Sequence, residues 1–429
     1  MLRAFKYRNY RLFFSGQLVS LIGTWITTTA TSWLVYRLTG NPWYLGVVGF
    51  ASQFPAFLFS SAAGIYVDRW DRRKLLIATQ CCSMVIAFTL AALTLSGHIS
   101  IHVLIGISVV QGLVNAFDMP CRQAFVTNIV ENKADLGNAI ALNSSMFNGA
   151  RLVGPSIAAT VIAATSEGWC FLIDGVSFLA VLLALLAMKV DARPQGGRVH
   201  ASAFQQFKEG WRYAFGFMPI RSIIGLLAIS SLLGVSGTVL MPVFARDILH
   251  GGPQTYGILL TATGFGALLG AVWLASRPSV VGLGPMIPVA AGLFGTGLMI
   301  MSISRSIALS MLALVVTGFG MMVQAACSNT VLQTIVPDDK RGRTMSFFLM
   351  AYLGAAPIGS LIAGALSGFI GAPLTLFIGG ASCLAGALWF ASGLKTFHEN
   401  IRPIFIDLGL ITETQVAEAE LAALNDAGV

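Results

Sequence analysis

The sequence predicts an all-α membrane protein in which twelve transmembrane helices form two pseudo-symmetric six-helix bundles. Of its 429 residues, 56% are hydrophobic and only 10% are charged, whereas a soluble protein carries about 25% charged residues. The basic residues collect in short segments on one side of the apolar runs, and similar motifs recur in the two halves of the chain. Composition, charge placement and internal repetition therefore indicate the same architecture.

A membrane span needs about 20 mostly apolar residues, and the chain contains twelve such windows. The first six fall within residues 1–188 and the last six within residues 220–394, and each set is expected to form one bundle. The windows are Leu12–Tyr36, Trp43–Val67, Leu75–Leu95, Val103–Val130, Leu136–Thr165, Trp169–Met188, Ile220–Ala245, Tyr256–Ala275, Pro285–Ser304, Ile307–Val336, Thr344–Phe369 and Pro373–Leu394.

Two polar segments lie outside the bundles. Residues 189–219 form the one long polar connection between spans, and residues 204–217 within it can form an amphipathic helix on the membrane surface. The tail, residues 395–429, is polar and acidic, and its residues 412–424 can form a short cytoplasmic helix. We expect the first segment to act as a cytoplasmic linker between the two bundles.

Lysine and arginine predict the orientation, because short loops rich in these residues stay on the cytoplasmic side of a membrane. With the N-terminus inside, cytoplasmic segments hold 21 of the 26 basic residues. Outside lie Arg37, Arg246 and Arg305, and two further arginines fall within the membrane. We therefore expect both termini in the cytoplasm. The same rule explains the net charge of +8, so nucleic acid is not expected as a partner.

Internal repetition supports two halves of six spans each. Gly64 and Gly270 both sit near the cytoplasmic end of the second span of their half, and Ile129-Val130 and Ile335-Val336 end the fourth spans at the same separation. The sequence around Gly46, in Asn-Pro-Trp-Tyr-Leu-Gly, is echoed around Gly257, in Gly-Pro-Gln-Thr-Tyr-Gly. Duplicated halves are typical of transporters whose substrate site lies between the halves near the midplane.

The turn between the second and third spans carries four positive charges in the stretch Gly64-Ile-Tyr-Val-Asp68-Arg69-Trp-Asp71-Arg72-Arg73-Lys74. We interpret Gly64, Asp68, Arg69, Arg72 and Arg73 within it as a gating motif. Asp68 is the informative residue, because an acid at the edge of a span is costly. The positive charges alone are explained by their role in setting the orientation of the chain. The alternative is a solvated turn that only sets the orientation.

The gating interpretation predicts two contacts. Asp68 is expected to cap the N-terminus of the eleventh span, where Thr344 begins a helix with a positive dipole end. Arg72 is expected to pair with Glu131 or Asp135 at the inner ends of the fourth and fifth spans. Such a latch closes the cytoplasmic side and must break to open it.

Asp118 and Asp174 are the carboxylates that fall clearly inside spans, where ionisable groups are costly and need a reason. Asp118 and Arg122 lie one helical turn apart and can pair, and Arg151 in the fifth span is a second candidate partner. Asp118 is then either a protonation site coupled to substrate movement or part of a structural ion-pair cluster, since arginines keep a carboxylate ionised. Asp174, near the external end of the sixth span, is expected to face water.

Further polar side chains, Asn115, Gln324 and Asn329, can line a central path. Together with Asp118, Arg122, Arg151 and Asp174 they make up the predicted substrate and proton pathway. The chain has no G-x-x-x-x-G-K-[ST] loop, so neither an enzyme nor a cofactor is expected. His98 and His102 lack a third ligand nearby in sequence, so no metal site is expected either.

Several stretches resemble a known family, namely Arg8-Asn-Tyr-Arg11-Leu-Phe, the Gly64–Lys74 turn, Asp118-Met-Pro120-Cys-Arg122, Arg151-Leu-Val-Gly154-Pro155 and Arg341-Gly342-Arg343. From Tyr7 to Leu394 the chain resembles major facilitator superfamily (MFS) transporters, and more narrowly the drug/proton antiporter branch that includes the enterobactin exporter and macrolide efflux proteins. The resemblance implies the MFS fold, proton-driven export by rocker-switch alternating access, and a helix-packing role for Gly154 and Pro155.

The chain also departs from the superfamily's motifs. Ser108 stands where the fourth-span pattern R-x-x-Q-G has its arginine, and Ala158-Ala159 replace two glycines of the fifth-span motif. Asp71 replaces a glycine of the gating motif, and Leu274 replaces the acid in its second-half copy. These departures bear on coupling, where Arg122 is the candidate substitute for the missing arginine, and leave the fold expectation unchanged.

We therefore expect a monomeric, multi-pass exporter of a small amphipathic molecule, of siderophore or drug type, in the bacterial inner (plasma) membrane. Its expected partners are that substrate, protons and the lipid bilayer. Two alternatives remain open: a transporter of lysophospholipid or another lipid with the same fold, and a non-transporting membrane sensor.

Overall fold

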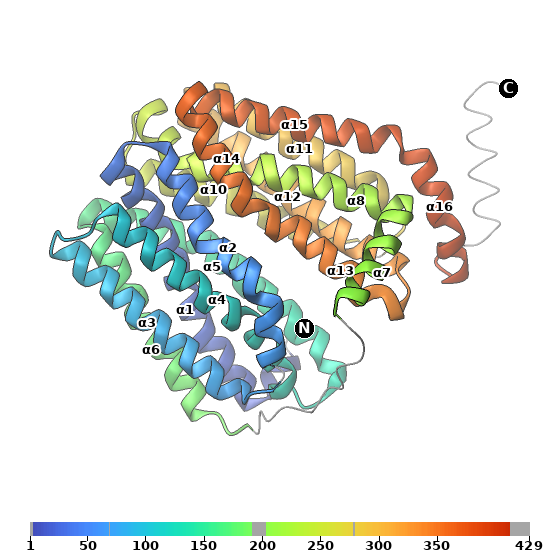
Figure 1. Ribbon diagram of the computed structural model, residues 1–429, viewed down its shortest axis with the longest axis horizontal. Helices are drawn as coiled ribbons and strands as arrows, with labels where there is room; N and C mark the ends of the chain where they lie inside the picture. The colour runs from blue at the N-terminus through green and yellow to red at the C-terminus, as the bar shows by residue number, and fades with distance from the viewer. Residues whose placement is uncertain (1–2, 68, 191–202, 278, 412–429) are drawn as a thin grey trace.

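A computed structural model describes residues 3–67, 69–190, 203–277 and 279–411, and the regular elements within these ranges are all helical. Figure 1 shows long rods in two groups, one from each half of the chain. The first group consists of η1 (Arg3–Lys6), α1 (Arg8–Thr39), α2 (Pro42–Val67), α3 (Arg72–Leu95), α4 (Ile101–Ile129), η2 (Lys133–Asp135), α5 (Leu136–Ala164) and α6 (Glu167–Ala187).

The second group begins with the linker helix and contains the broken spans. Its elements are α7 (Ala203–Gly216), α8 (Met218–Ile229), η3 (Ser230–Gly234), η4 (Val235–Leu240), α9 (Met241–Val243), η5 (Phe244–Ile248), α10 (Pro253–Ala275), α11 (Leu283–Ile303), α12 (Ile307–Ile335), α13 (Asp338–Leu349), η6 (Met350–Gly354), α14 (Ala355–Ile370), α15 (Ala372–Ser392) and α16 (Leu394–Asp407).

The predicted spans correspond to these rods. Within the described residues, ten continuous helical stretches are long and apolar enough to cross a membrane. The helices α2 and α5, of 26 and 29 residues, are also long enough, although α5 carries Asn143, Asn148 and Arg151 and is less apolar. With these two, the all-helical membrane fold of two six-helix bundles is confirmed.

Local sequence signals explain the short turns between the spans. Asp71 caps α3, because its Oδ1 accepts hydrogen bonds from the backbone N–H groups of Arg73 (2.9 Å) and Lys74 (3.1 Å). Gly40 ends α1 in the left-handed conformation, with φ of 59°, which glycine adopts without a steric penalty. Such caps let two antiparallel spans follow each other within a few residues.

The seventh and eleventh spans are interrupted, which the sequence analysis did not anticipate. The seventh passes through the π-helical turn η3, the 3₁₀ turn η4 and the π-helical turn η5. Gly234 and Gly237 weaken the α-helix there, and Pro242 lacks the backbone donor for a carbonyl one turn earlier. The eleventh span begins at Asp338, six residues before the predicted Thr344, and contains the π-helical turn η6.

The hydrophobic cores show how the two groups meet. We call the end that holds α7 and the turn between α2 and α3 the linker end, and the other end the opposite end. At the linker end, one apolar cluster belongs to the first half and includes Phe13 and Phe125, while a separate cluster belongs to the second half and includes Phe347. At the opposite end a single cluster joins the halves and includes Trp33 and Tyr256.

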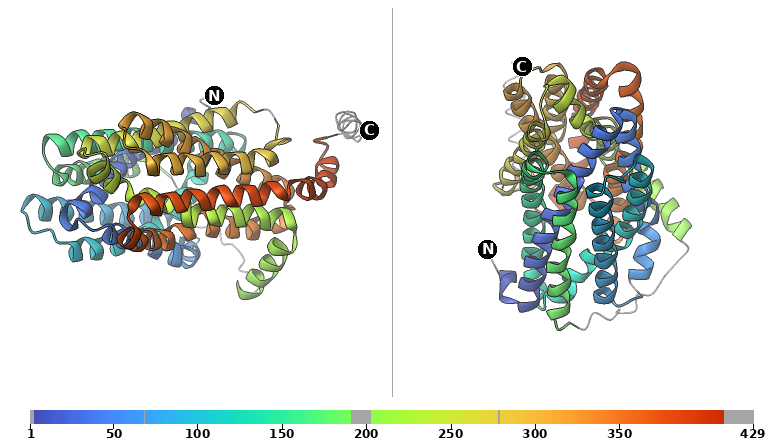
Figure 2. Two further views of the ribbon diagram at one scale, coloured as in Figure 1. Left: turned by 90° about the horizontal axis from the view of Figure 1, so that it is seen from above. Right: turned by 90° about the vertical axis from the view of Figure 1, so that its left-hand side faces the viewer.

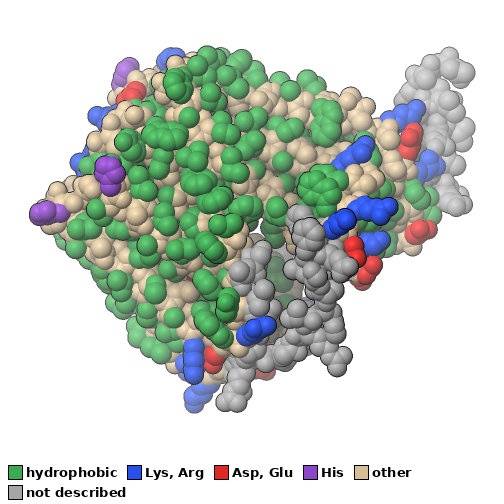
Figure 3. All heavy atoms as spheres, viewed as in Figure 1, with side chains coloured by type: hydrophobic (Ala, Val, Ile, Leu, Met, Phe, Trp, Pro, Cys, Tyr) green, Lys and Arg blue, Asp and Glu red, His purple; other side chains and the backbone are tan. Residues whose placement is uncertain are grey.

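The halves therefore form one body at the opposite end and separate at the linker end. In Figure 1 the rods of the two groups diverge toward α7 and α13, whereas the two turned views of Figure 2 show them running roughly in parallel. In the space-filling view the surface is hollowed between the two groups (Figure 3). Within the described residues, this arrangement leaves an opening on the linker side.

The flanks of the molecule match a hydrocarbon environment. In Figure 3 apolar side chains cover the visible face between charged ends. Leu183 and Leu388 keep 66% and 64% of their area exposed on span helices, which fits lipid contact rather than a protein core. At the linker end the predicted amphipathic helix is found as α7. The tail begins with α16, which the sequence analysis missed, and the predicted helix at 412–424 lies outside the described residues.

Candidate functional site

Side chains from both halves close the opposite end. The rings of Trp33 on α1 and Tyr256 on α10 stack with centroids 5.9 Å apart. The Tyr36 hydroxyl donates a hydrogen bond to the carboxylate of Asp247, and the Arg246 guanidinium lies 5.8 Å from the centre of the Tyr36 ring. Sequence reasoning missed this gate, although an acid next to an external arginine at a span end was a usable signal.

Below this gate the halves touch through small residues. A Cβ on Gly46 of α2 would lie 2.5 Å from the carbonyl oxygen of Ser360 on α14. A Cβ on Gly257 of α10 would lie 2.3 Å from the Cβ of Ala159 and 2.9 Å from the carbonyl oxygen of Pro155, both on α5. Only glycine permits these approaches. The two glycines that echo each other in the sequence thus make equivalent contacts between the halves.

Asp118 on α4 is buried and fully hydrogen-bonded. Its Oδ2 pairs with Nη2 of Arg122 one turn later, as predicted. Its Oδ1 accepts from the Thr79 hydroxyl (2.9 Å) and from Nε2 of Gln80 (2.7 Å), both on α3. Because α3 belongs to the same bundle, the carboxylate faces the inside of the first half. This geometry favours the structural ion-pair interpretation over the pathway interpretation.

Arg151 on α5 lies elsewhere. Its guanidinium sits 5.7 Å from the centre of the Trp25 ring on α1, so the structure does not bring it to Asp118. Gly154, one turn later, faces the same helix, because a Cβ there would lie 2.4 Å from the Cβ of Trp25. Pro155 presents its carbonyl to α10. This stretch therefore packs α5 against both α1 and the second half.

Asp174 on α6 is 3% exposed, so the expectation that it faces water is wrong. It is covered by α1, where Gly23 allows a close approach: a Cβ there would lie 2.6 Å from Oδ1 of Asp174. The Ser177 hydroxyl lies 3.3 Å from that oxygen. Among the described residues no lysine or arginine lies within ion-pair distance of this carboxyl group. It differs in this respect from Asp118.

The remaining predicted pathway residues are scattered. Asn115 accepts a hydrogen bond from Gln111 on its own helix (3.1 Å). Gln324 is buried inside the second half and donates to the Ser230 hydroxyl in η3 (2.8 Å), beside a cavity of about 10 Å³, close to the size of one water molecule. Asn329 accepts from Gln333 (3.0 Å). The structure does not gather these side chains into one site.

The gating motif is only partly described. Asp68 lies outside the described residues. A Cβ on Gly64 would meet no atom within 4 Å, so this glycine is not at a close contact in the conformation shown. Nη1 of Arg72 donates to Asn128 on α4 (2.9 Å). Arg73 donates to the carbonyls of Leu185 and Leu186 at the end of α6, which ties α3 to the end of that helix.

Asp135 and Thr344, two of the predicted partners of the motif, have other contacts in this conformation. Asp135 accepts hydrogen bonds from the ammonium of Lys6 (2.6 Å) and the hydroxyl of Tyr7 (2.8 Å). These bonds lower the pKa of Asp135 below its ordinary value of 3.8 and raise the pKa of Lys6 above 10.5. Thr344 is buried within α13 and bonds to the Lys340 carbonyl.

Comparison with known proteins places these features in a family context. Residues 2–404 match the family described as transmembrane secretion effector. The chain is 28% identical over 385 residues to the staphyloferrin A transporter of Staphylococcus aureus, covering 89% of this chain and 95% of that protein. It is 24% identical over 353 residues to the multidrug efflux pump Tap of Mycolicibacterium fortuitum, covering 80% and 86% of the two chains.

A solved structure agrees in fold. A bacterial homologue of the human lysosomal transporter Spinster, in an inward-facing and occupied conformation, superposes with a TM-score of 0.67 and 14% identity. The match covers 92% of this chain and 97% of that one.

Proposed function

The chain belongs to the transmembrane secretion effector family of MFS transporters, whose relatives include siderophore and drug exporters, and we propose that it exports a small amphipathic molecule of siderophore or drug type. The single observation that carries this proposal is the pair of cores that separate at the linker end and merge at the opposite end. A chain that closes on one side and opens on the other is suited to alternating access.

In this proposal the linker end faces the cytoplasm of a bacterium, and both termini lie there. The excess of lysine and arginine in the short segments of that end supports this orientation. The protein works as a monomer in the inner membrane, because each chain holds both halves of the pathway. The conformation described is then open to the cytoplasm, ready to receive a substrate, and closed to the outside by the Tyr36–Asp247 contact.

Outward opening requires the reverse arrangement. The Trp33–Tyr256 stack and the Tyr36–Asp247 bond separate, and the cytoplasmic ends of the halves meet. In that state the gating motif closes the inner side, with Asp68 at the start of α13. The bonds from Arg72 to Asn128 and from Arg73 to the end of α6 hold these two arginines on the first half.

We assign the coupling proton to Asp174 rather than to Asp118. A carboxylate that pairs with an arginine and accepts two further hydrogen bonds is stabilised in its charged form. Asp174 has hydroxyl neighbours and no cation within ion-pair distance among the described residues, and an unpaired charge in the hydrocarbon is costly. Protonation of Asp174 removes the free-energy cost of burying its charge. A buried acid of this kind is suited to proton antiport.

The test uses inside-out membrane vesicles that carry the protein in their membrane and contain a fluorescent pH probe. Siderophores and macrolide-type drugs are added one by one after a proton gradient has formed, and proton efflux that follows a given compound identifies it as a substrate. Asp174→Asn should abolish this proton movement while substrate exchange at equal concentrations continues. Asp118→Asn, in protein that remains folded, should retain both activities.

Two outcomes overturn parts of the proposal. Binding of compounds without any exchange across the membrane means that the protein is a sensor rather than an exporter. Normal proton-driven export by the Asp174→Asn variant excludes Asp174 as the coupling site.

A further inference from the structure

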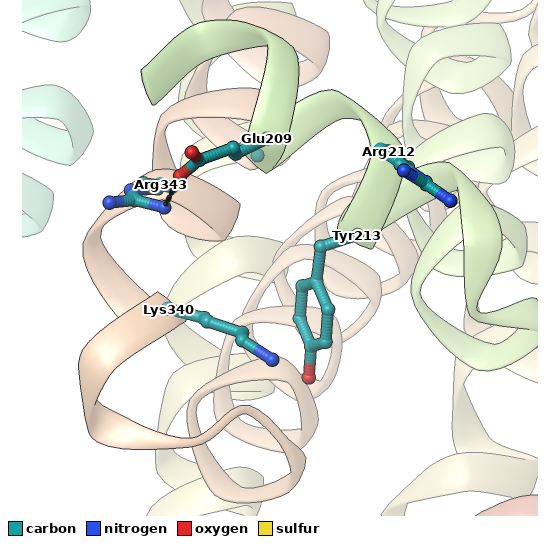
Figure 4. Close-up of a pocket in the computed structure, with 6 residues that line it drawn as sticks. Glu209, Arg212, Tyr213, Lys340 and Arg343 are labelled. Carbon is teal, nitrogen blue, oxygen red and sulfur yellow. Dashed lines mark hydrogen bonds and ion pairs between the residues drawn. The ribbon is translucent and has the colours of Figure 1, made fainter. Parts of the chain in front are cut away.

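A basic cleft lies at the linker end, between two helices of the second group. It has a volume of about 360 Å³ and is lined by residues of the linker helix α7 and of α13, the inner part of the eleventh span. Figure 4 shows Lys340 and Tyr213 directed toward each other across it, with Glu209 joined to Arg343 along one side and Arg212 directed away from them. Each of the two helices thus contributes part of the lining.

The two cations on α13 are poorly explained by the helix itself. Lys340 and Arg343 are three residues apart, so they lie on the same face of the helix. Both occur near its N-terminus, where the helix dipole disfavours positive charge. Asp338 and Asp339 already occupy the first turn and complement that dipole. Both cations instead make their contacts with α7, Arg343 with Glu209 and Lys340 with the Tyr213 ring.

The carboxylates of the described residues do not neutralise all the positive charge at the cleft. Glu209 Oε2 pairs with Nη1 of Arg343 at 2.7 Å. The Lys340 ammonium lies 4.5 Å from the centre of the Tyr213 ring, and among the described residues neither Lys340 nor Arg212 has a carboxylate within ion-pair distance. Burial raises the pKa of Tyr213, so its hydroxyl stays a neutral donor at physiological pH. Arg343 thus has a carboxylate partner in Glu209, whereas the Lys340 ammonium meets only the Tyr213 ring.

The cleft also borders an apolar surface suited to lipid. Trp211 of α7 stacks on Phe215 with ring centroids 4.0 Å apart and meets the edge of Phe347 on α13. Half of Trp211 nevertheless remains exposed. Tryptophan prefers the boundary between hydrocarbon and headgroups, and α7 is an amphipathic helix next to a span. A ligand in the cleft would therefore have an anionic part beside Lys340 and an apolar part beside Trp211.

We propose that the cleft between α7 and α13 binds the phosphate headgroup of an anionic phospholipid from the inner leaflet. The phosphate lies between Lys340 and Arg343 and accepts from the Tyr213 hydroxyl, while an acyl chain runs along Trp211. Bound lipid joins the linker helix to the inner part of the eleventh span, the segment that the gating motif must reach. A soluble phosphate shares the headgroup chemistry but makes no use of the exposed indole.

Lipid binding is measured on the purified full-length protein in neutral detergent, by native mass spectrometry, without reference to transport. Phosphatidylglycerol should bind at least tenfold more tightly than phosphatidylcholine, and excess inorganic phosphate should not displace it. Lys340→Gln should weaken phosphatidylglycerol binding about fivefold, the effect of one cation near an anionic membrane surface. Glu209→Gln should strengthen it two- to fivefold, because Arg343 loses its competing carboxylate.

Lys395→Gln serves as the matched control, because Lys395 is an exposed lysine on α16 at the same end of the same half, outside the cleft. It should leave binding unchanged. Equal weakening by Lys340→Gln and Lys395→Gln would mean general surface attraction and would overturn the proposal. Unchanged binding in Lys340→Gln overturns it as well. Displacement of lipid by inorganic phosphate at matched concentration would reassign the cleft to a soluble anion.

Discussion

Replacing Gly257 by alanine should shift the protein away from the conformation that is closed at the opposite end. The new methyl group would lie 2.3 Å from the Cβ of Ala159, where ordinary contacts measure 3.4–4 Å. In a close-packed interface the two halves must then move apart by roughly 1–1.5 Å at this point. Overpacking of this kind costs about 1–3 kcal/mol. The cost falls only on the closed arrangement, because α5 and α10 belong to different halves.

A penalty of that size changes the ratio of the two conformations by about 5- to 150-fold in favour of the conformation that is open at the opposite end. Double electron–electron resonance measures this ratio with spin labels on cysteines that replace Ser96 and Ser306. Both positions are exposed and lie at the opposite end, one in each half. The background carries Cys81→Ser and Cys82→Ser, since the other four native cysteines are buried. The longer label distance should gain population in the Gly257→Ala variant.

Gly106→Ala is the matched control. It makes the same chemical change within a span helix, but a Cβ at Gly106 meets no atom within 4 Å. Both variants gain the same intrinsic helix propensity, so a difference between them reports the contact between halves. If Gly257→Ala and Gly106→Ala give the same distance distribution, α5 and α10 do not form the closing contact and the reasoning fails.

Three further predictions use the charged and hydrogen-bonded groups. Asp118→Asn should lower the free energy of unfolding by about 3 kcal/mol, the low end for breaking a buried pair, because its arginine partner keeps 28% of its side chain exposed; a loss below 1 kcal/mol in a denaturant titration would contradict the structural interpretation. Tyr36→Phe removes a hydrogen bond to the Asp247 side chain worth about 1.5 kcal/mol in the closed state only, so the same spin-label assay should show opening at the opposite end favoured roughly tenfold, and unchanged distances would argue against a gate. The pKa of Asp135 is lowered, chiefly by Lys6, so the stabilising effect of its carboxylate is present above about pH 4 and is lost as the pH falls through the lowered pKa; Asp135→Asn should reduce the thermal midpoint more at pH 7 than at acid pH, as measured by differential scanning fluorimetry.

The spans could be predicted from the sequence because the bilayer imposes a length on apolar segments. The helix α3 begins at Arg72 and α12 ends at Ile335, within a few residues of the predicted edges. The interruption of the seventh span could not be predicted in the same way. A π-helical turn changes the hydrogen-bond register without changing how apolar the segment is, and Gly234 and Pro242 were its visible signals.

The candidate site was predicted where its contacts are local and missed where they cross between helices. The pair of Asp118 and Arg122 follows from a spacing of four residues on one helix. The absence of Arg151 from that cluster depends on how α5 is rotated about its axis, which no spacing within one helix reveals. Asp174 was expected to face water because it lies near a span end, but Gly23 on another helix lets α1 cover it.

The two echoed glycines connect the sequence repeat to the mechanism. Gly46 and Gly257 occupy equivalent positions in the two halves, and each meets a backbone or a small side chain of the other half. Interfaces of small residues bring backbones into close contact without interlocking long side chains. They can therefore separate and form again without side chains changing rotamers against one another. Within each half, by contrast, bulky residues such as Phe13 and Phe125 pack against each other, as the proposed movement of two rigid bundles requires.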